Sequence, residues 1–598
     1  MSLTWSENAL YIQAAESLRD NASQWQAYES IGHCVLLAGP GSGKTKTLTL
    51  KLARMLNENI EAPRGLACIT YSNECARELE NRLRQLGVES GGRVFIGTVH
   101  SFSLTQILLP YAKVARLGLP ENFTIANRQQ TREVLEIAFK EVIGGPENSQ
   151  DWAFRLAKHR RSFLNRDRPE WRTTDPQMTS LVEAYEKELR ERGLIDFDDM
   201  PLLAVRALHE NRWLRSALVA KYPVLAVDEY QDLGTALHEI VLQLCFGAGM
   251  RLFAVGDVDQ SIYGFTGAAP ILLNQLAERH DVETIRLGLN YRCGRKIVNT
   301  SEYVLGENRN YRTPNNAHEG SIYFHPRNEG ISKQAYYLID HLIPEIQKRN
   351  LVSNLGNIAV LYPAAFLGNE IERVAKEKGY KVIRTDTNAL YPRSSKLMRW
   401  LELCAIWCCG GWRAGEPRAS QVMRDGINMF YDAVSEEKER LKFQQTLIKV
   451  LWSRRDGAMS LYQWLVELCC DIITPLVSRS RLLSDEYGIL RSFMEEIGPN
   501  GNIDDFTLGE FAGLGNGIES IQLSTLHSSK GREFDVVILF AIEEGNLPRR
   551  RSGQNEIVEA RRLFYVGFTR ARYEVHLIYN ENNESRFVTE LLERMGES

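Results

Sequence analysis

The chain has 598 residues and a formal net charge of −4, with 44% hydrophobic and 25% charged residues, a balance typical of a globular protein. One hydrophobic core does not keep growing at this length, so we expect several domains, and the near-neutral charge leaves any nucleic-acid partner dependent on local basic patches. No apolar run reaches the ~18–20 residues that a membrane span needs, and the N-terminus lacks the basic and then apolar pattern of a secretion signal, so we expect a cytoplasmic protein.

A phosphate-binding loop is the first chemical motif along the chain. Residues 33–38 form an apolar block of buried-strand length, and after residue 45 leucines recur at helical spacing. The sequence AGPGSGKT at 38–45 joins this strand to the helix and matches G-x-x-x-x-G-K-[ST]. In that pattern glycines let backbone N–H groups surround a phosphate, Lys44 supplies charge at the β- and γ-phosphates, and Thr45 offers a hydroxyl to Mg²⁺. A chance match is the alternative, and the loop alone indicates only a protein that binds or hydrolyses a nucleotide.

Strands and helices alternate around this loop. Gln24 lies on an expected helix upstream, where its paired amide donor and acceptor suit an adenine edge. Residues 65–70 and 94–96 are predicted as two further buried strands. The second ends in GTVHSF at 97–102, with hydroxyls and an aromatic at the edge where open α/β sheets bind ligands; a plain strand-to-helix turn is the alternative. The alternation predicts a doubly wound parallel sheet.

The alternation stops between residues 104 and 189, where the pattern is mostly helical. Cationic side chains are interleaved there with aromatic ones, which suits phosphate contacts and base stacking by a nucleic acid. A charged run is more commonly a solvated face, and Asp167 and Glu170 dilute this one, so both interpretations stay open. The cations are Arg155, Lys158, Arg160, Arg161, Arg166, Arg168 and Arg172.

Two acidic residues, Asp228 and Glu229, follow the apolar strand predicted at 222–227. Both would lie at the carboxyl end of the sheet, where the phosphate loop also opens. Asp228 would hold the Mg²⁺ that Thr45 touches, and Glu229 would orient and deprotonate the water that attacks the γ-phosphate. Beyond the next strand stand a glutamine suited to the γ-phosphate and two aromatics suited to base stacking, namely Gln260, Tyr263 and Phe265.

Five of the ten cysteines fall in two groups within a second helical region, from about residue 401 to 515. A metal or iron–sulfur centre is one interpretation. Their apolar neighbours and the lack of a familiar zinc spacing favour the other, in which they are small hydrophobic side chains of a packed core. These cysteines are Cys404, Cys408, Cys409, Cys469 and Cys470.

The ordered set of motifs resembles the UvrD/Rep/PcrA group of superfamily 1 DNA helicases over most of the chain. Further matches are DFDD at 196–199, LNYR at 289–292, TLHSSKGREF at 525–534 and EARRLFYVGFTRA at 559–571. The resemblance implies an α/β fold of two RecA-like parallel-sheet domains with a P-loop, each domain carrying a mainly helical insertion. It divides the chain into domain 1A at 1–103 and 190–281, insertion 1B at 104–189, domain 2A at 282–400 and 516–598, and insertion 2B at 401–515.

The same resemblance implies an ATP and Mg²⁺ site. In it Tyr291 would stack on the adenine and Glu533 would meet the ribose. Arg292 and Arg570 would reach the γ-phosphate from the second RecA-like domain. The implied catalytic residues are Lys44, Asp228, Glu229, Gln260, Arg292 and Arg570. The implied ATP-binding residues are Gln24, Gly39, Gly41, Ser42, Gly43, Lys44, Thr45, Lys46, Tyr291, Gly531 and Glu533, with Thr45 and Asp228 as the metal ligands. The implied DNA-binding residues are Tyr71, Asn73, Thr98, His100, Tyr263, Phe265, Thr525 and His527.

The activity that the resemblance implies is an ATP-dependent single-stranded DNA translocase and 3′–5′ helicase, acting on single-stranded and tailed duplex DNA, with DNA repair as one role. The polarity comes from the resemblance alone, and RNA stays an alternative because stacking and phosphate contacts do not read the 2′-hydroxyl. Five positions outside the catalytic set depart from the family pattern and bear on the grip on DNA. They are Lys46, Glu74, Val99, Thr266 and Pro363.

A second interpretation is a nucleotide- and DNA-sensing subunit that gates a partner nuclease. The departures motivate it, together with a 2B insertion that looks shorter than in the large housekeeping helicases. Compact UvrD-like helicases of this sort occur in bacterial anti-phage defence systems such as Gabija. The sequence ends soon after residue 571, so we expect no appended nuclease domain.

Overall fold

The computed structural model describes residues 5–88, 92–120, 122–264, 267–349, 352, 354–386, 388–392, 395–415, 417–480, 483–499, 501, 506–516 and 519–596. The chain forms two compact units, which are described separately. The first consists of Met1–Ser321, Arg550–Tyr573 and Phe587–Ser598, and the second of Ile322–Arg549 and Glu574–Arg586. Within the described ranges, no helix has both the length and the apolar character that crossing a membrane requires.

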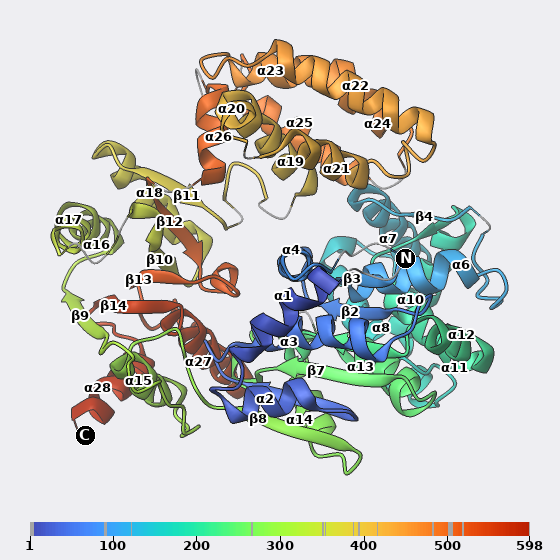
Figure 1. The fold of residues 1–598 in the computed structure, drawn as a ribbon, viewed down its shortest axis with the longest axis horizontal. Helices are drawn as coiled ribbons and strands as arrows, with labels where there is room; N and C mark the ends of the chain where they lie inside the picture. Colours follow the sequence, from blue (N-terminus) through green and yellow to red (C-terminus); the bar gives the residue numbers. More distant parts are fainter. Residues whose placement is uncertain are drawn as a thin grey trace. The chain divides into compact units, whose positions relative to one another are not determined.

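A six-stranded parallel sheet forms the centre of the first unit (Figure 1), in the order β3-β2-β6-β7-β1-β8. Its inner strands are short and almost continuously apolar, as expected of parallel strands that are covered on both faces, whereas the edge strand β8 exposes Glu283, Thr284 and Arg286. The predicted parallel α/β fold is therefore confirmed. The strands are β1 (His33–Ala38), β2 (Leu66–Thr70), β3 (Val94–Thr98), β6 (Val224–Val227), β7 (Arg251–Gly256) and β8 (Val282–Leu287).

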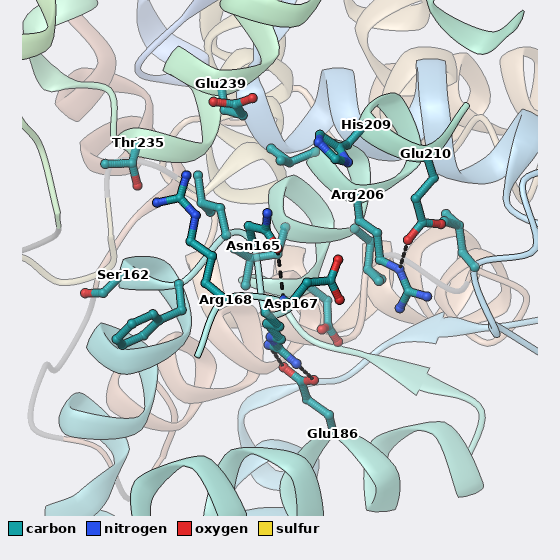
Figure 2. A pocket seen from close by; sticks show the side chains of 18 of the residues that line it. Ser162, Asn165, Asp167, Arg168, Glu186, Arg206, His209, Glu210, Thr235 and Glu239 are labelled. Carbon is teal, nitrogen blue, oxygen red and sulfur yellow. Dashed lines mark hydrogen bonds and ion pairs between the residues drawn. The ribbon is translucent and has the colours of Figure 1, made fainter. Parts of the chain in front are cut away.

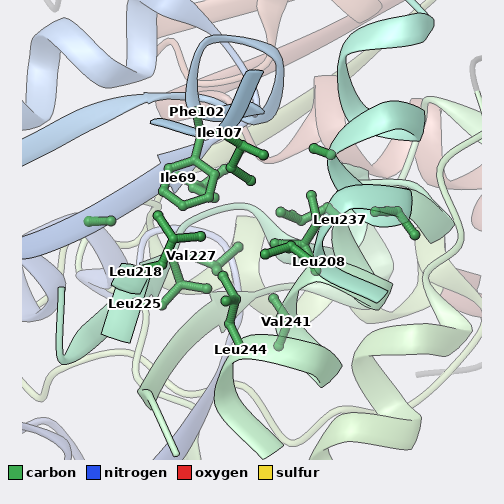
Figure 3. Packing of buried hydrophobic residues seen from close by; sticks show 14 of the residues in the cluster. Ile69, Phe102, Ile107, Leu208, Leu218, Leu225, Val227, Leu237, Val241 and Leu244 are labelled. Atoms are coloured by element: carbon green, nitrogen blue, oxygen red, sulfur yellow. The ribbon is translucent and has the colours of Figure 1, made fainter. Parts of the chain in front are cut away.

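Helices cover both faces of this sheet, and successive residues of each strand alternate between two hydrophobic cores. Leu225 and Val227 of β6 belong to one core, whereas Val224 and Ala226 belong to the other. Figure 3 shows the first core, where Phe102 and Leu208 pack near β6. Its helices are α5 (Val99–Phe102), α11 (Asp199–Glu210), α12 (Arg212–Lys221) and α13 (Thr235–Val241), and those of the other core are α3 (Lys44–Arg54) and α4 (Asn73–Gln85).

The predicted insertion at 104–189 is mainly helical, with a small core of its own that includes Trp171 and Tyr185. Asn127 opens α7 with a reciprocal capping box, its side chain accepting from Gln130 N–H while the Gln130 side chain accepts from Asn127 N–H. The elements are α6 (Leu109–Tyr111), β4 (Thr124–Ile125), α7 (Arg128–Val142), α8 (Ala153–Ser162), α9 (Glu170–Thr173) and α10 (Pro176–Glu191), and β4 pairs in parallel with β5 (Leu194–Ile195).

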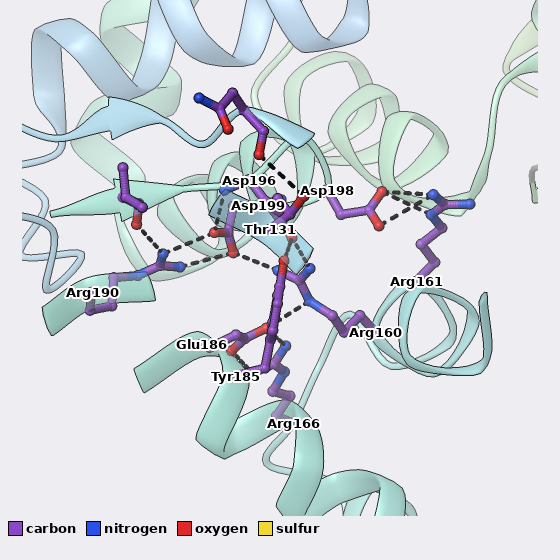
Figure 4. A network of polar contacts seen from close by, with 12 residues as sticks. Thr131, Arg160, Arg161, Arg166, Tyr185, Glu186, Arg190, Asp196, Asp198 and Asp199 are labelled. Atoms are coloured by element: carbon purple, nitrogen blue, oxygen red, sulfur yellow. Dashed lines mark hydrogen bonds and ion pairs between the residues drawn. The ribbon is translucent and has the colours of Figure 1, made fainter. Parts of the chain in front are cut away.

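A buried ion-pair network fixes α8 and α10 to the DFDD segment (Figure 4). Arg160 is fully buried and donates to Glu186 at 2.9 Å, to Asp196 at 2.6 Å and to Asp199 at 2.7 Å. Arg166 also pairs with Glu186, at 2.6 Å. Both interpretations of the cation run were therefore wrong for Arg160, because a fully buried guanidinium is neither a solvated group nor a DNA contact. A count of cations along the sequence does not reveal which of them face carboxylates.

Arg160→Met is expected to lower the free energy of unfolding by about 3–5 kcal/mol, because three largely buried carboxylates would lose the cation that compensates them. Urea unfolding followed by hydrogen exchange in α8 and α10 measures the change. Arg155→Met is the matched control on the same helix: the Arg155 side chain is 55% exposed and pairs with Asp175 at only 3.6 Å, so a change below about 0.5 kcal/mol is expected. Equal stability of the two variants would contradict the structural role of Arg160.

A second six-stranded sheet forms the centre of the second unit, in the order β11-β12-β10-β13-β14-β9. Strand β10 pairs in parallel with both β12 and β13, and β11 pairs in parallel with β12. This arrangement confirms the prediction of a second parallel-strand domain. The strands are β9 (Ser321–Arg327), β10 (Ile358–Tyr362), β11 (Lys381–Arg384), β12 (Ser520–Thr525), β13 (Phe534–Phe540) and β14 (Ala571–Asn580).

A helical segment with its own hydrophobic core interrupts this sheet between β11 and β12. Trp464 and Phe511 are fully buried in that core. Of the five cysteines in question, Cys404, Cys408 and Cys469 are buried in this core, whereas Cys409 and Cys470 are exposed. The main helices are α19 (Lys396–Ile406), α21 (Ala419–Met429), α22 (Glu437–Ser453), α23 (Leu461–Leu468), α25 (Ser484–Glu496) and α26 (Leu508–Asn516).

The boundaries of the four predicted segments stay a prediction. Strand β8 (Val282–Leu287), which we placed at the start of domain 2A, hydrogen-bonds to β1 in the first sheet. Strand β5, placed in domain 1A, pairs with β4 of the insertion, and β9 to β14 form the second sheet.

Candidate nucleotide-binding site

The phosphate loop lies between β1 and α3, as its sequence predicts. Gly41 and Gly43 have φ angles of 64° and 80°, in the left-handed region that glycine adopts without strain. The buried Ser42 hydroxyl donates to Gly39 O at 2.7 Å and closes the turn. The loop therefore leads directly into the N-terminus of α3, whose free N–H groups and dipole suit a phosphate.

The LNYR segment packs directly on this loop. Tyr291 N–H donates to Gly41 O at 2.8 Å, and the Asn290 side-chain oxygen accepts from Arg292 N–H at 2.8 Å. A Cβ atom added to Gly41 would lie 2.6 Å from Asn290 Oδ1 and 2.7 Å from Arg292 Cβ, so only glycine fits there. This packing places Tyr291 and Arg292 against the loop.

The two predicted acidic residues stand at the end of β6, beside the loop lysine. Lys44 Nζ lies 3.6 Å from Glu229 Oε1, and neither side chain is much exposed. Asp228 is buried, and burial together with the charge of Glu229 raises the pKa of its carboxyl to about 7, although Lys44 opposes the shift. A cation and two carboxylates thus share one site at the carboxyl edge of the sheet.

Glu229 has a strained backbone. Its φ of 50° is in the left-handed region, which costs a non-glycine residue roughly 1–3 kcal/mol and occurs mainly at functional sites. Gln231 holds the side chain, because its amide nitrogen donates to Glu229 Oε2 at 2.5 Å. The buried Gln231 also accepts from Asp257 N–H at 2.9 Å. One glutamine therefore connects the acidic residue after β6 to the segment after β7.

Gln260 and Arg570 form a hydrogen-bonded pair next to Asp257, in the segment after β7. Arg570 Nη2 donates to Gln260 Oε1 at 3.0 Å, and both side chains are buried. The Gln260 amide nitrogen donates in turn to Asp257 Oδ2 at 2.5 Å, and Arg570 Nε donates to Val566 O at 3.0 Å. Arg570 and Gln260 are 310 residues apart in the sequence, yet they form one hydrogen-bonded pair within the first unit.

The predicted base-binding residues gather around α2 (Ala22–Glu29). Its N-cap, Asn21, donates from its side-chain amide to the Tyr291 hydroxyl at 3.1 Å. The buried Gln24 donates from its side-chain amide to Ser42 O at 2.8 Å. Tyr291 is 49% exposed. Gln24 and Tyr291, predicted to contact the adenine, are thus brought to one end of the phosphate loop.

The acidic residues also fit a divalent cation. Among the described residues, Asp228 Oδ1 is buried and has no hydrogen-bond partner. A buried carboxylate oxygen without a donor is costly, whereas Mg²⁺ takes such oxygen ligands. Thr45, the other predicted ligand, is the second residue of α3 and is partly exposed.

Comparisons with known proteins give the family. Sequence profiles of the UvrD/REP helicase N-terminal domain and the UvrD-like helicase C-terminal domain match residues 20–281 and 458–582. The ATP-dependent DNA helicase Rep of Escherichia coli strain K12 is 26% identical over 93% of this chain and 90% of its own length. The ATP-dependent DNA helicase PcrA of Bacillus subtilis strain 168 is 27% identical over 95% of this chain and 85% of its own. The chain belongs to the UvrD-like helicases of superfamily 1A.

As a UvrD-like helicase, the chain is an enzyme that uses and hydrolyses ATP. The first profile contains the phosphate loop, both acidic residues and Gln260, and the second contains Arg570. Tyr291 and Arg292 lie in neither matched range, and the hydrogen bond from Tyr291 N–H to Gly41 O connects this segment to the loop.

The DNA contacts predicted for this UvrD-like helicase lie on the same edge of the first sheet. The rings of Tyr71 and Tyr263 stack on each other, with centroids 4.5 Å apart and planes 20° apart. His100 stacks on Phe197 at 3.8 Å, and Phe197 is 61% exposed. Burial lowers the pKa of His100 to about 4, so the ring is neutral near pH 7. Thr98 caps α5 by accepting from Ser101 N–H at 3.3 Å.

Two predicted DNA contacts are not placed by the structure. Phe265 lies outside the described residues, and of Asn73 only the backbone, at the start of α4, is described. Of the five departures from the family pattern, Thr266 is outside the described residues and the Glu74 side chain is likewise not described. Lys46 is exposed on α3.

Four predicted site residues belong to the second unit of the helicase. Thr525 ends β12, and its hydroxyl donates to the Ser528 hydroxyl at 2.9 Å. Burial lowers the pKa of His527 to about 4, with Arg549 adding to the effect. Gly531 has a φ of 82°, and Glu533 is exposed just before β13. Their roles toward DNA and the ribose stay predictions.

The sequence analysis assigned no role to three residues that shape this site. Asn21 donates to the Tyr291 hydroxyl, and Asn290 accepts from Arg292 N–H. Tyr311 lies against the loop, because a Cβ atom added to Gly39 would be 2.4 Å from its ring. Asn21 carries a sequence signal, because asparagine is a preferred helix N-cap. Tyr311 carries none, since it follows no motif.

A separate cavity of about 940 Å³ lies between the turn after α8 and helices α11 and α13 (Figure 2). Among the described residues, none of the ATP- or DNA-binding residues implied by the family resemblance lines it, whereas Arg166 and Arg168 of the cation run do. Three arginines of its wall are paired with carboxylates, at 2.6 to 2.8 Å. The pairs are Arg166 with Glu186, Arg190 with Asp199 and Arg206 with Glu210.

Proposed function

We propose that the chain is an ATP-driven translocase on single-stranded DNA and a 3′–5′ DNA helicase. The pairing of Arg570 with Gln260 at 3.0 Å supports the motor function best, because Gln260 is connected through Asp257 and Gln231 to Glu229. The substrate is inferred from the relatives, since Rep and PcrA are named ATP-dependent DNA helicases.

In the proposed hydrolysis each residue has one task. Lys44 and Arg570 stabilise the negative charge that develops on the γ-phosphate, and Arg292 assists them. Glu229, held by Gln231, orients and deprotonates the attacking water. Mg²⁺, held by Asp228 and Thr45 when bound, would neutralise phosphate charge. Tyr291 stacks on the base, and Gln24 reads its edge.

A short chain of contacts connects this chemistry to the stacked tyrosines. Gln231 bonds to both Glu229 and the Asp257 backbone, and Gln260 bonds to Asp257 and Arg570. Tyr263 follows Gln260 by three residues and stacks on Tyr71. Loss of the γ-phosphate would therefore change the contacts of Gln260, and the same segment would carry the change to the stacked rings of Tyr263 and Tyr71.

The ring pair itself suits a stepping surface for DNA. Rings with centroids 4.5 Å apart leave no room for a base between them, so a base must stack on an outer face or the rings must part. Alternating between these arrangements during the ATP cycle would release and regrip the strand.

Unwinding of tailed duplexes tests the proposal. We expect the full chain with ATP and Mg²⁺ to separate a duplex with a 3′ single-stranded tail and to leave a 5′-tailed duplex intact, whereas Lys44→Ala should separate neither. Opening of only the 5′-tailed duplex would overturn the polarity. ATP turnover stimulated by single-stranded DNA without unwinding of either duplex would overturn the helicase assignment and favour the nuclease-gating subunit. An RNA strand of the same sequence, assayed for ATPase stimulation, separates DNA from RNA preference.

A further inference from the structure

We propose that Lys51 is a positioning residue for base selection, because it holds the helix that carries Gln24 onto the helix that follows the phosphate loop. The inference rests on the proposed role of Gln24 as the reader of the adenine edge. It adds a residue that touches no nucleotide and that belongs to none of the sequence motifs.

Lys51 lies on α3 and is only 1% exposed. Its ammonium group donates to Tyr28 O at 2.6 Å and to Ser30 O at 2.5 Å. These two carbonyls belong to the last turn and the C-cap of α2, where backbone oxygens have no partner within the helix. The lysine thus satisfies the end of one helix from inside the other.

No ion pair joins Lys51 to a carboxylate among the described residues. Burial and the neighbouring charges of Arg251 and Arg54 lower the pKa of Lys51 to about 7. An unpaired buried lysine is costly unless hydrogen bonds compensate it, and here the two carbonyls do so. A neutral amine retains two hydrogens, so both bonds persist when the group loses its proton. The contact between Lys51 and α2 therefore depends on the length of the side chain and on its N–H donors rather than on its charge.

Two further cationic side chains donate hydrogen bonds to the same end of α2. Arg54 Nη1 donates to Tyr28 O at 3.2 Å, and Arg251 Nη2 donates to Ser30 O at 2.5 Å. Cations at a helix C-terminus also interact favourably with its dipole. Lys51 is the most buried of the three and bonds to both carbonyls, so it is the central contact of this clamp.

The other end of α2 faces the base. Asn21 caps the helix and contacts the Tyr291 hydroxyl, and Gln24 lies one turn in. One amide hydrogen of Gln24 is used by Ser42 O, which fixes the plane of the amide and leaves the second hydrogen and Oε1 for a base edge. Such a reading requires the amide to be placed within a fraction of an ångström. Helix α2 has only eight residues, so the hydrogen bonds of Lys51 at its C-terminal end also fix the position of the Gln24 amide near its N-terminal end.

The test compares ATP with GTP as substrates of the purified full chain, measured as kcat/KM in the presence of single-stranded DNA. Gln24→Ala is expected to lower the preference for ATP by about five- to tenfold, the worth of one lost hydrogen bond. Lys51→Met should lower it to a similar extent through KM for ATP, with kcat at saturating ATP within about twofold of the wild type. The double variant should lose no more preference than Gln24→Ala alone, because both changes act on the same amide.

Arg93→Met is the matched control. Arg93 also donates to two backbone carbonyls of the first unit, Ile60 O at 2.5 Å and Arg64 O at 2.8 Å, but it does not touch α2. Its preference for ATP should equal that of the wild type, so any general loss of stability is separated from loss of positioning. If Lys51→Met does not fold, Arg251→Met, which removes a second donor to Ser30 O, takes its place and should lower the preference in the same direction.

The outcomes separate the two ideas. Unchanged ATP preference in Gln24→Ala would overturn the role of Gln24 and, with it, base selection through Lys51. A lower preference in Gln24→Ala but not in Lys51→Met, or an equal loss in Arg93→Met, would overturn the role of Lys51 alone. A double variant that loses the product of the two single effects would show that Lys51 does not act through Gln24.

Discussion

Glu229→Gln is expected to slow steady-state ATP hydrolysis by about 10²–10⁴-fold while leaving ATP and DNA binding intact. The amide keeps the shape of the carboxyl group at the end of β6 but cannot take a proton from water. ATP affinity should hold or rise, because Lys44 loses the acidic neighbour 3.6 Å away that competes with the phosphates for its charge. Single-turnover hydrolysis, with fluorescent-nucleotide and single-stranded DNA binding, separates the chemical step from the binding steps.

Glu239→Gln is the matched control for this change. Glu239 lies on α13 of the same unit and, like Glu229, accepts a hydrogen bond from a glutamine, Gln243 at 2.9 Å. It is remote from the phosphate loop in sequence and belongs to none of the motifs. Wild-type turnover is expected for it. Near wild-type turnover of Glu229→Gln would refute Glu229 as the general base, and loss of ATP binding would show that its role is structural.

Local chemistry made the phosphate loop and the acidic pair predictable from the sequence. Gly41, Gly43 and Lys44 are close neighbours, and the strand before Asp228 is apolar enough to be recognised, so the strand–loop–helix geometry follows from short stretches. The parallel sheet follows from the same alternation. The structure adds little here beyond distances and the strained backbone of Glu229.

The contacts that complete the site were not predictable by physical reasoning from the sequence. Arg570 reaches Gln260 across 310 residues, and only the family resemblance suggested that it belongs to the site. Arg160 looked like one more cation of a basic run, because a sequence pattern does not show that three carboxylates converge on it. Lys51 looked like an ordinary helix residue. In each case the deciding fact is a partner that is distant in sequence.

Arg570→Ala is expected to lower kcat for ATP hydrolysis by about 10³-fold or more, the effect of removing an arginine that stabilises charge on the transferred phosphoryl group. KM for ATP should change far less, because Lys44 and the loop still bind the phosphates in the ground state. Gln260→Ala should lower kcat less, since Arg570 would lose its contact at 3.0 Å but keep its bond to Val566 O. Steady-state kinetics at saturating single-stranded DNA measure kcat and KM for ATP of both variants.

Arg561→Ala controls for the loss of a motif arginine that serves packing instead. Arg561 is on α27 (Gln554–Phe568), close to Arg570 in sequence, and its guanidinium pairs with Glu590 at 2.6 Å and donates to Val304 O at 3.3 Å. It should lower thermal stability yet leave kcat near that of the wild type. Arg570→Ala with wild-type kcat would contradict the arginine's place at the γ-phosphate. The double variant of Arg570 and Gln260 shows how the glutamine acts. If it loses no more activity than Arg570→Ala alone, Gln260 acts by orienting the arginine. If the two losses add, Gln260 contacts the phosphate or the water on its own.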